Sequence, residues 1–366
     1  GEIYSTSETK EISELLLADA AKINNHDETP LYSLNDISGT MSLWKTLNYH
    51  EALPRGGFKI EAYNAGHILG SAMIKFTSSQ GKTMLFTGDL GNSPSILMPD
   101  REKVSGLDYL LIESVYGDKN HEHRGEREEK FKRVVEESIA RGGTLLIPAF
   151  SLERTQIILY ELNKLFESKQ ITSVPVYLDS PLAIKITEIY EKVKNLYNQE
   201  STTAARKDDI FKFSQLKETA SVRDSREIAN VPGAKIIIAG SGMSTAGRIV
   251  GHEEIFLPDP NSTLLLVGYQ GVGTLGRQIE EGIKKLTIDN KQITIKARVE
   301  KIHGFSGHAD SDALVDFVSE SRGSLKKVFV AMGEPKSSIF LSQRLRDELE
   351  IDAVVVEKEK TYEIDL

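Results

Sequence analysis

Two imidazoles and two carboxylates of this 366-residue chain lie where the sequence predicts that strands end. His67 lies in the Gly-flanked turn of "AGHILGSA", Asp89 in "FTGDLG", Glu113 at the end of "YLLIES" and His308 in "GFSGHAD". Taken singly, each is an ordinary turn or capping residue, and a lone histidine between glycines more often satisfies local hydrogen bonds than binds a metal. Four such residues at strand ends, where side chains of neighbouring strands converge, favour a metal site. Nitrogen and oxygen donors of this kind suit zinc or another first-row divalent cation.

The composition limits what kind of site this is. The chain contains no cysteine, which excludes disulfides, thiolate ligands and a cysteine nucleophile and fits a cytoplasmic location. The formal net charge of -9 repels polyanions at long range, so a nucleic-acid partner would need a local basic groove or bound metal ions. No apolar run approaches the roughly 18 residues that a membrane span needs.

The elements that must position the four residues follow two patterns. Alternating runs at residues 58–63, 71–76 and 83–87 predict strands separated by Gly-bearing turns, and "LDYLLIES" predicts a buried strand that ends at Glu113. From about residue 118, short apolar strands alternate with helices, which indicates βαβ units and a parallel sheet. We therefore expect an α/β domain inserted into a β-rich host. The expected limits are 1–117 for the first part of the host, 118–300 for the insert and 301–366 for the returning segment.

Six stretches carry a resemblance to a known family. In chain order they are "AGHILGSA", "FTGDLG", "ESVYGD", "VYLDSPLA", "AGSGM" and "GFSGHAD". They resemble the β-CASP branch of the metallo-β-lactamase superfamily, which includes RNase J and the cleavage and polyadenylation endonuclease, and the likeness runs from residue 1 to about residue 345. It implies a metallo-β-lactamase αββα-type core with a parallel-sheet α/β β-CASP domain inserted after the Glu113 strand. It further implies that His67 is a zinc ligand and that Asp89 bridges two zinc ions. His308 would protonate the leaving oxygen, oriented by Glu113.

The sequence departs from the family pattern in two places. The ligand cluster His-x-His-x-Asp-His belongs upstream of "EIYST", so we expect an N-terminally incomplete core that lacks roughly 80 residues of an ordinary domain; a naturally degenerate homologue is the alternative. The "HEH" stretch at His121–His123 does not replace that cluster, because "RGER" follows it. Met332 stands in "VFVAMGEP" where the family has a histidine that binds the second zinc. A thioether is a poor zinc ligand, so the second site is in doubt.

A second group of residues fits an anion. In "GSGMSTAGR", Ser241, Gly242 and Arg248 open a helix after a strand, an arrangement that either caps the helix or binds an anion. With the family resemblance, a contact to the RNA backbone phosphate is expected, and Ser180 in "LDSP" and Arg154 in "SLERTQ" are further candidates for the same region. The "GVGTLG" stretch matches a dinucleotide fingerprint but is better explained as a tight turn. His252 is expected on a helix surface, and His26 and His50 in solvated positions.

These observations favour a zinc-dependent phosphodiesterase that cleaves single-stranded RNA, endo- or exonucleolytically, in the cleft between the two domains. A zinc pair clamps both oxygens of an in-line displacement, and a histidine held by a carboxylate is a suitable general acid. One rival is a hydrolase of the same fold that acts on DNA or a small ester, and another is a non-catalytic RNA-binding or scaffold homologue. We expect little or no activity from the chain as given, because two ligands alone do not hold zinc in a catalytic geometry. The oligomeric state stays open, and a homodimer is one option.

Overall fold

The computed structural model describes residues 1–24 and 30–366, so His26 lies outside the described residues. Contacts divide the chain into one unit formed by Gly1–His121 together with Gly307–Leu366 and a second unit formed by Glu122–Ser306. Both units combine helices with β-sheets, which is the predicted fold class. The domain limits expected at 117/118 and 300/301 stay predictions, because a division by contacts does not test whether each part folds alone.

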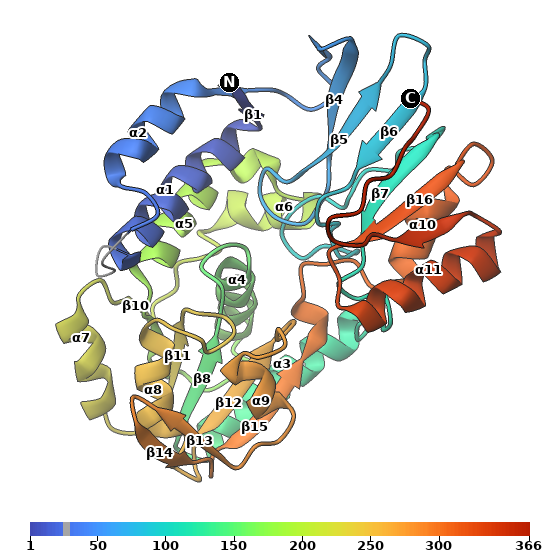
Figure 1. Ribbon diagram of the computed structural model, residues 1–366. Helices are drawn as coiled ribbons and strands as arrows, with labels where there is room; N and C mark the ends of the chain where they lie inside the picture. Colours follow the sequence, from blue (N-terminus) through green and yellow to red (C-terminus); the bar gives the residue numbers. More distant parts are fainter. Residues whose placement is uncertain (25–29) are drawn as a thin grey trace. The chain divides into compact units, whose positions relative to one another are not determined.

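The first unit is built on a seven-stranded mixed sheet. Its strands follow the order β17-β16-β7-β6-β5-β4-β3, of which Figure 1 labels β16, β7, β6, β5 and β4. The pairs from β3 to β6 are antiparallel, whereas β6, β7, β16 and β17 run parallel. The strands are β3 (Leu53–Arg55), β4 (Phe58–Asn64), β5 (Ala72–Thr77), β6 (Thr83–Phe86), β7 (Tyr109–Glu113), β16 (Lys327–Ala331) and β17 (Ala353–Val355).

Alternation along these strands separates two faces of the sheet. One face presents fully buried side chains such as Leu85 and Leu110, against which helices α10 (Ser311–Ser319) and α11 (Pro335–Leu349) pack. The other face presents Met84, Tyr109 and Phe329, and the C-terminal segment covers it with Tyr362, Ile364 and Leu366. The sheet is therefore held between two helices and an extended tail, and its strand ends are rigidly placed.

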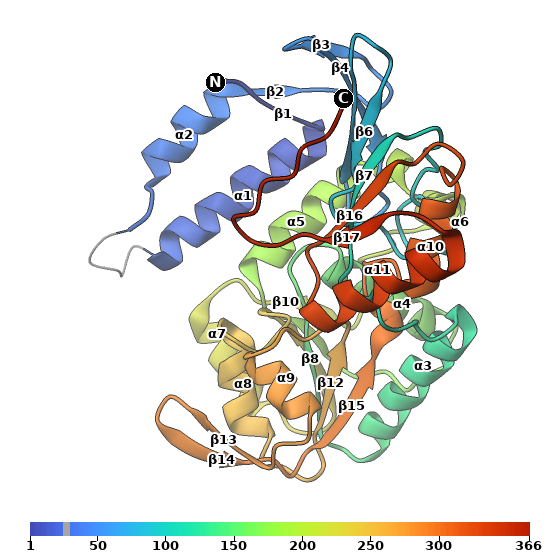
Figure 2. The ribbon, with the colours of Figure 1, turned by 45° about the vertical axis from the view of Figure 1, so that its right-hand side comes forward.

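The beginning of the chain adds a smaller element to the first unit. Strands β1 (Ile3–Ser5) and β2 (Trp44–Thr46) pair in parallel. The segment that joins them forms helices α1 (Ser7–Asn24) and α2 (Leu34–Leu43), which lie side by side (Figure 2). The Thr6 hydroxyl donates a hydrogen bond of 2.7 Å to the carbonyl oxygen of Gly70. This bond ties the start of α1 to the loop that follows β4.

The second unit contains a six-stranded parallel sheet in the order β10-β9-β11-β8-β12-β15. Its central strands are apolar and buried on both faces, as expected for a parallel sheet covered by helices on each side. A separate antiparallel hairpin, β13–β14, packs its apolar face on the same core. The strands are β8 (Thr144–Pro148), β9 (Val176–Leu178), β10 (Leu216–Glu218), β11 (Lys235–Ala239), β12 (Thr263–Val267), β13 (Lys285–Ile288), β14 (Lys291–Thr294) and β15 (Arg298–Ile302). The α-helices are α3 (Arg124–Ala140), α4 (Arg154–Glu167), α5 (Pro181–Lys192), α6 (Gln199–Lys207), α7 (Val222–Glu227), α8 (Arg248–Phe256) and α9 (Leu275–Glu280).

Candidate metal centre

Three neighbouring parallel strands of the first unit place polar residues at one edge of the sheet. Asp89 follows β6, Glu113 ends β7 and Met332 follows β16, and these strands are adjacent. Because the carboxyl ends of parallel strands meet at the same edge, residues far apart in sequence gather there. His67 reaches the edge from the loop between β4 and β5, and His308 from the segment just before α10.

Close backbone approach joins the His67 loop to the Asp89 loop. The amide of Gly91 donates a hydrogen bond of 2.8 Å to the carbonyl oxygen of Ala65. A Cβ atom on Gly91 would lie only 2.0 Å from the carbonyl oxygen of Gly66, so this position excludes any larger residue. Gly66 itself has a φ of 69°, which favours glycine. The glycines that flank the two polar residues therefore allow the two loops to touch.

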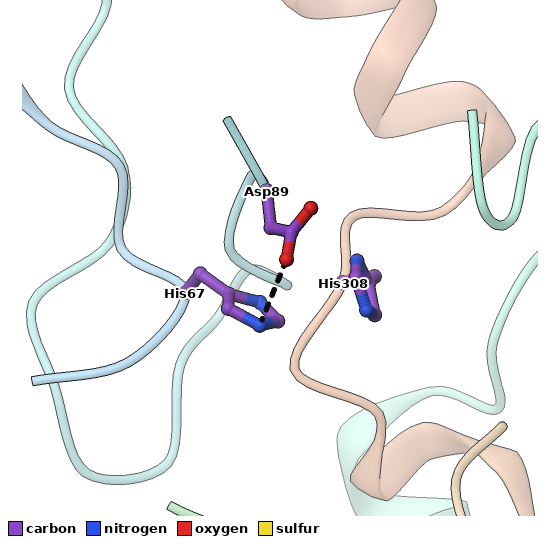
Figure 3. Close-up of side chains that lie close together, drawn as sticks. All are labelled: His67, Asp89 and His308. Atoms are coloured by element: carbon purple, nitrogen blue, oxygen red, sulfur yellow. Dashed lines mark ion pairs between the residues drawn. The ribbon is translucent and has the colours of Figure 1, made fainter. Parts of the chain in front are cut away.

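His67, Asp89 and His308 form a compact cluster at this edge. The Nε2 atom of His67 lies 3.8 Å from Oδ2 of Asp89, and the two imidazole centroids lie 4.5 Å apart. One ligand atom from each of the three residues lies within 4.8 Å of the others. Figure 3 shows the carboxylate of Asp89 directed at the ring of His67, with the ring of His308 beside them. Within residues 1–24 and 30–366, this is the group of at least three His, Asp or Glu side chains close enough to share a metal ion.

Glu113 lies behind His308 and is completely buried. Both of its carboxylate oxygens are 3.1 Å from Nδ1 of His308. One of these oxygens also accepts a hydrogen bond of 2.7 Å from the amide of Leu90, and the other accepts one from the amide of Val115. A carboxylate at Nδ1 fixes that nitrogen as the donor, so Nε2 is the ring nitrogen that His308 can use for chemistry.

The cluster fits zinc by the chemistry of its donors. Two imidazoles and one carboxylate are a set of three protein ligands typical of catalytic zinc sites. Met332 follows β16 at the same sheet edge, with a φ of 59° and a half-exposed side chain. Its thioether adds no good zinc ligand, and the expected weakness of a second site stays a prediction. A bridging role for Asp89 stays a prediction.

In the second unit, the predicted phosphate-binding residues lie at the carboxyl ends of adjacent parallel strands. The hydroxyl oxygens of Ser151 and Ser180, which follow β8 and β9, are 3.3 Å apart. Gly240 comes directly after β11, and a Cβ atom there would lie 3.8 Å from the hydroxyl oxygen of Ser151 and 4.0 Å from that of Ser180. Ser241 and buried Gly242 continue that turn, so the structure brings Ser180 close to the loop that contains them. Their binding of phosphate stays a prediction.

Arg248 is engaged within its own unit. Its Nη1 donates to Oδ1 of Asp179 at 2.6 Å and to the carbonyl oxygen of Thr219 at 2.8 Å. Its Nη2 donates to the carbonyl oxygen of Ala220 at 2.7 Å. These hydrogen bonds hold the start of α8 against neighbouring segments. A phosphate contact would therefore have to use the remaining donors of the guanidinium, and it too stays a prediction.

The expectation that His252 lies on a helix surface is wrong. His252 is only 4% exposed, and its Nε2 lies 2.7 Å from Oδ2 of Asp179. Burial alone would raise the pKa of Asp179, but hydrogen bonds from His252, Ser225 and Arg248 outweigh it and hold that pKa below its usual value. The polar neighbours of His252 in sequence gave no sign of this buried carboxylate. His50 is exposed, as expected, and lies 3.2 Å from Glu102.

Sequence reasoning also missed a residue beside the cluster. His121 does not join the metal-ligand group, in keeping with the interpretation of "HEH" as unrelated to the ligand motif. Its Nε2 nevertheless lies 3.0 Å from the backbone carbonyl oxygen of His308. The partner is a main-chain atom, so no motif or spacing in the sequence could have indicated the contact.

Comparisons with known proteins place the chain in a class. The Beta-Casp domain family matches residues 155–279, and the Zn-dependent metallo-hydrolase RNA specificity domain family matches residues 292–356. The chain is 31% identical over 346 residues to Ribonuclease TTHA0252 of Thermus thermophilus, covering 94% of this chain and 78% of that protein. It is 32% identical over 357 residues to the RNase J-like protein of Methanocaldococcus jannaschii, covering 96% and 81%. The description of the second family places the chain in the class of Zn-dependent metallo-hydrolases.

The chain belongs to the β-CASP branch of the metallo-β-lactamase superfamily, as the sequence motifs predicted. It is also 31% identical over 355 residues to the transcription termination factor FttA of Pyrococcus horikoshii, of which it spans only 54%. A crystal structure of a protein of unknown function from Enterococcus faecalis shares the fold, with a TM-score of 0.53 at 11% identity over 98% of this chain and 75% of that one. No helix in the described part of the chain is both long and apolar enough to span a membrane.

Proposed function

We propose that the chain carries the site of a zinc-dependent phosphodiesterase that cleaves single-stranded RNA. The observation that carries the proposal is the convergence of His67, Asp89 and His308 with buried Glu113 behind His308. The names of its relatives support RNA as the substrate, since they include a ribonuclease and an RNase J-like protein.

In this proposal His67 and Asp89 are two of the metal ligands. When bound, zinc would polarise a phosphodiester oxygen and activate water as the nucleophile. The cluster lies at a partly exposed edge, and the side chain of Asp89 is 44% exposed, so a polymeric substrate could approach it from solvent.

His308 acts as the general acid. Glu113 holds the proton on Nδ1 and stabilises the imidazolium form, because its fully buried carboxylate lies 3.1 Å away. The Nε2 proton then transfers to the oxygen that leaves when the phosphorus–oxygen bond breaks. The same atom could instead complete the metal-ligand set, since His308 lies within the cluster.

Met332 favours a second candidate function, that of an RNA-binding homologue with a depleted metal site. A histidine ligand is replaced there by a thioether, which binds zinc poorly. The expected low activity of the chain as given also stays a prediction, and the wild-type measurement below tests it.

The test measures the wild-type chain as given, and it compares the full-length protein with its His308→Ala variant and the control His50→Ala. Zinc content is measured by elemental analysis, RNA binding by titration of a labelled single-stranded oligonucleotide, and cleavage with the same oligonucleotide. A general acid at His308 predicts a loss of at least about 100-fold in cleavage rate with zinc content and RNA binding retained. Loss of zinc as well would make His308 a ligand. Unchanged turnover in His308→Ala would remove this residue from the mechanism, and a wild-type chain that binds RNA without zinc would support the second candidate.

A further inference from the structure

We propose that His121 is a positioning residue for His308, a role that rests on the function proposed for that histidine. The inference starts from the backbone around His308. The carbonyl oxygen of Gly307 accepts a hydrogen bond of 2.8 Å from the amide of Asn92, and the amide of Ala309 donates one of 2.7 Å to the carbonyl oxygen of Leu90. These two bonds fix His308 on the side that faces the Asp89 loop.

The imidazole of His121 fixes the other side. Its Nε2 lies 3.0 Å from the carbonyl oxygen of His308. A carbonyl oxygen can only accept a hydrogen bond, so the proton of His121 must be on Nε2. Backbone polar atoms away from water need hydrogen-bond partners, and the side chain of His121 supplies the partner of the His308 carbonyl oxygen.

His121 is itself firmly held. Its ring lies over that of Tyr116, with centroids 4.3 Å apart and an interplanar angle of 57°. Tyr116 is 1% exposed, and its backbone pairs with that of Asp310. The amide of His121 donates a hydrogen bond of 3.2 Å to Oδ2 of Asp310. The imidazole is therefore a fixed donor rather than a mobile side chain.

The residues between Tyr116 and His121 extend this contact along the chain. The hydroxyl of Ser311 donates to the carbonyl oxygen of Gly117 at 2.8 Å, and the Ser311 amide donates to that of Lys119 at 3.1 Å. Asn120 and Asp312 exchange two further hydrogen bonds, of 2.7 and 3.2 Å. The segment 116–121 thus runs alongside the segment 308–312 and binds it by both backbone and side chains.

The consequence is that one continuous stretch, 113–121, controls His308 at two points. Glu113 sets the ring through Nδ1, and His121 sets the backbone from which the ring projects. Two fixed points determine the direction of Nε2, the atom that must reach the scissile bond. Rates of positioned reactions are sensitive to shifts of about 1 Å, so loss of the second point should lower turnover while leaving RNA binding in place.

Three variants separate the hydrogen bond from the packing. His121→Phe keeps a ring over Tyr116 but has no donor, whereas His121→Gln places an amide donor close to the position of Nε2. His50→Phe is the matched control, since His50 also contacts a tyrosine ring in the first unit, with centroids 5.2 Å apart. Hydrogen exchange, followed by mass spectrometry on the metal-free chains, reports on the segment 306–312. We expect faster exchange there in His121→Phe, and wild-type exchange in His121→Gln and His50→Phe.

Turnover of single-stranded RNA by the zinc-loaded full-length protein and its variants is the second readout. Loss of one positioning hydrogen bond predicts a fall in kcat of about 10-fold or more in His121→Phe, with KM within about 2-fold, and recovery to at least about a third of wild type in His121→Gln. Equal exchange in all four chains, or equal kcat in His121→Phe and wild type, would overturn the inference. Equal loss in His121→Phe and His121→Gln would show a packing role and overturn it as well. A full-length protein that neither binds zinc nor cleaves RNA would overturn the proposed function, and the exchange comparison would still decide whether His121 holds His308.

Discussion

Gly307 lies directly against the imidazole of His67. A Cβ atom at residue 307 would come within 3.0 Å of Cε1 and 3.1 Å of Nδ1 of that ring, and within 3.4 Å of the carbonyl oxygen of His67. Contacts this short would require the ring to shift by a few tenths of an ångström to admit a side chain. The residue just before His308 therefore packs directly against the His67 ring, and a side chain at residue 307 would displace that ring.

This contact predicts that Gly307→Ala weakens zinc binding. A methyl group there should displace the His67 ring and lower zinc affinity by about 10-fold or more, because metal ligands tolerate only small displacements. Gly323→Ala is the control, since a Cβ at that position of the same unit meets nothing within 4 Å. Zinc affinity is measured by competition with a chelator, and equal affinities for the two variants would contradict the prediction.

Met332 allows a direct test of the second zinc site. Met332→His should raise the amount of zinc bound per chain, because an imidazole replaces a thioether at the edge where Asp89 and Glu113 also lie. The backbone there has a φ of 59°, a conformation that histidine adopts more readily than most residues. Ile339→His, which puts a histidine at an exposed position of α11, controls for non-specific binding. Identical zinc stoichiometry in the two variants would show that residue 332 does not limit the second site.

Strands and their polar ends could be predicted, whereas strand partners could not. Alternation and Gly-bearing turns identified the runs at 58–63, 71–76 and 83–87, which form β4, β5 and β6. The run "ITIKARVEKI" also alternates, but it divides into β14 of the separate hairpin and β15 of the parallel sheet. A period of two residues indicates a strand and its faces but carries no information on which strand lies beside it.

The same contrast between local pattern and distant partner explains which residues of the candidate site could be predicted. The proximity of His67, Asp89, Glu113 and His308 could be expected, because strand ends of one sheet converge; their roles remain proposals. His121 and His252 could not be placed from the sequence. Their partners are a backbone carbonyl 187 residues away and a buried carboxylate 73 residues away, and neither contact leaves a local pattern.

The buried contact between His252 and Asp179 predicts a large effect on stability. His252→Leu should lower the free energy of unfolding by about 2–4 kcal/mol, because it leaves a fully buried carboxylate with one hydrogen bond fewer. His303→Leu is the comparison in the same unit, where the imidazole lies 3.6 Å from Glu280 and is about one-third exposed. An ion pair near the surface contributes at most about 1 kcal/mol to the free energy of unfolding, so His303→Leu should have the smaller effect. Urea denaturation followed by circular dichroism measures both, and similar losses would contradict a special role for the buried pair.

Glu253 on α8 predicts a pH dependence of stability. The residue is fully buried, its carboxyl group accepts a hydrogen bond from the Ser244 hydroxyl, and burial raises its pKa from 4.5 to about 7. Between these values the folded chain keeps a proton that the unfolded chain has released, so the stabilisation is present at low pH and is lost as pH rises toward and through about 7.

Glu253→Gln cannot ionise and should remove this dependence. The difference in free energy of unfolding between variant and wild type should therefore grow by roughly 3 kcal/mol from pH 4.5 to pH 7.5. Glu254→Gln, on the same helix but in an ion pair with Lys291, is the control. A difference for Glu253→Gln that stays constant with pH would show that Glu253 does not hold its proton in the folded chain.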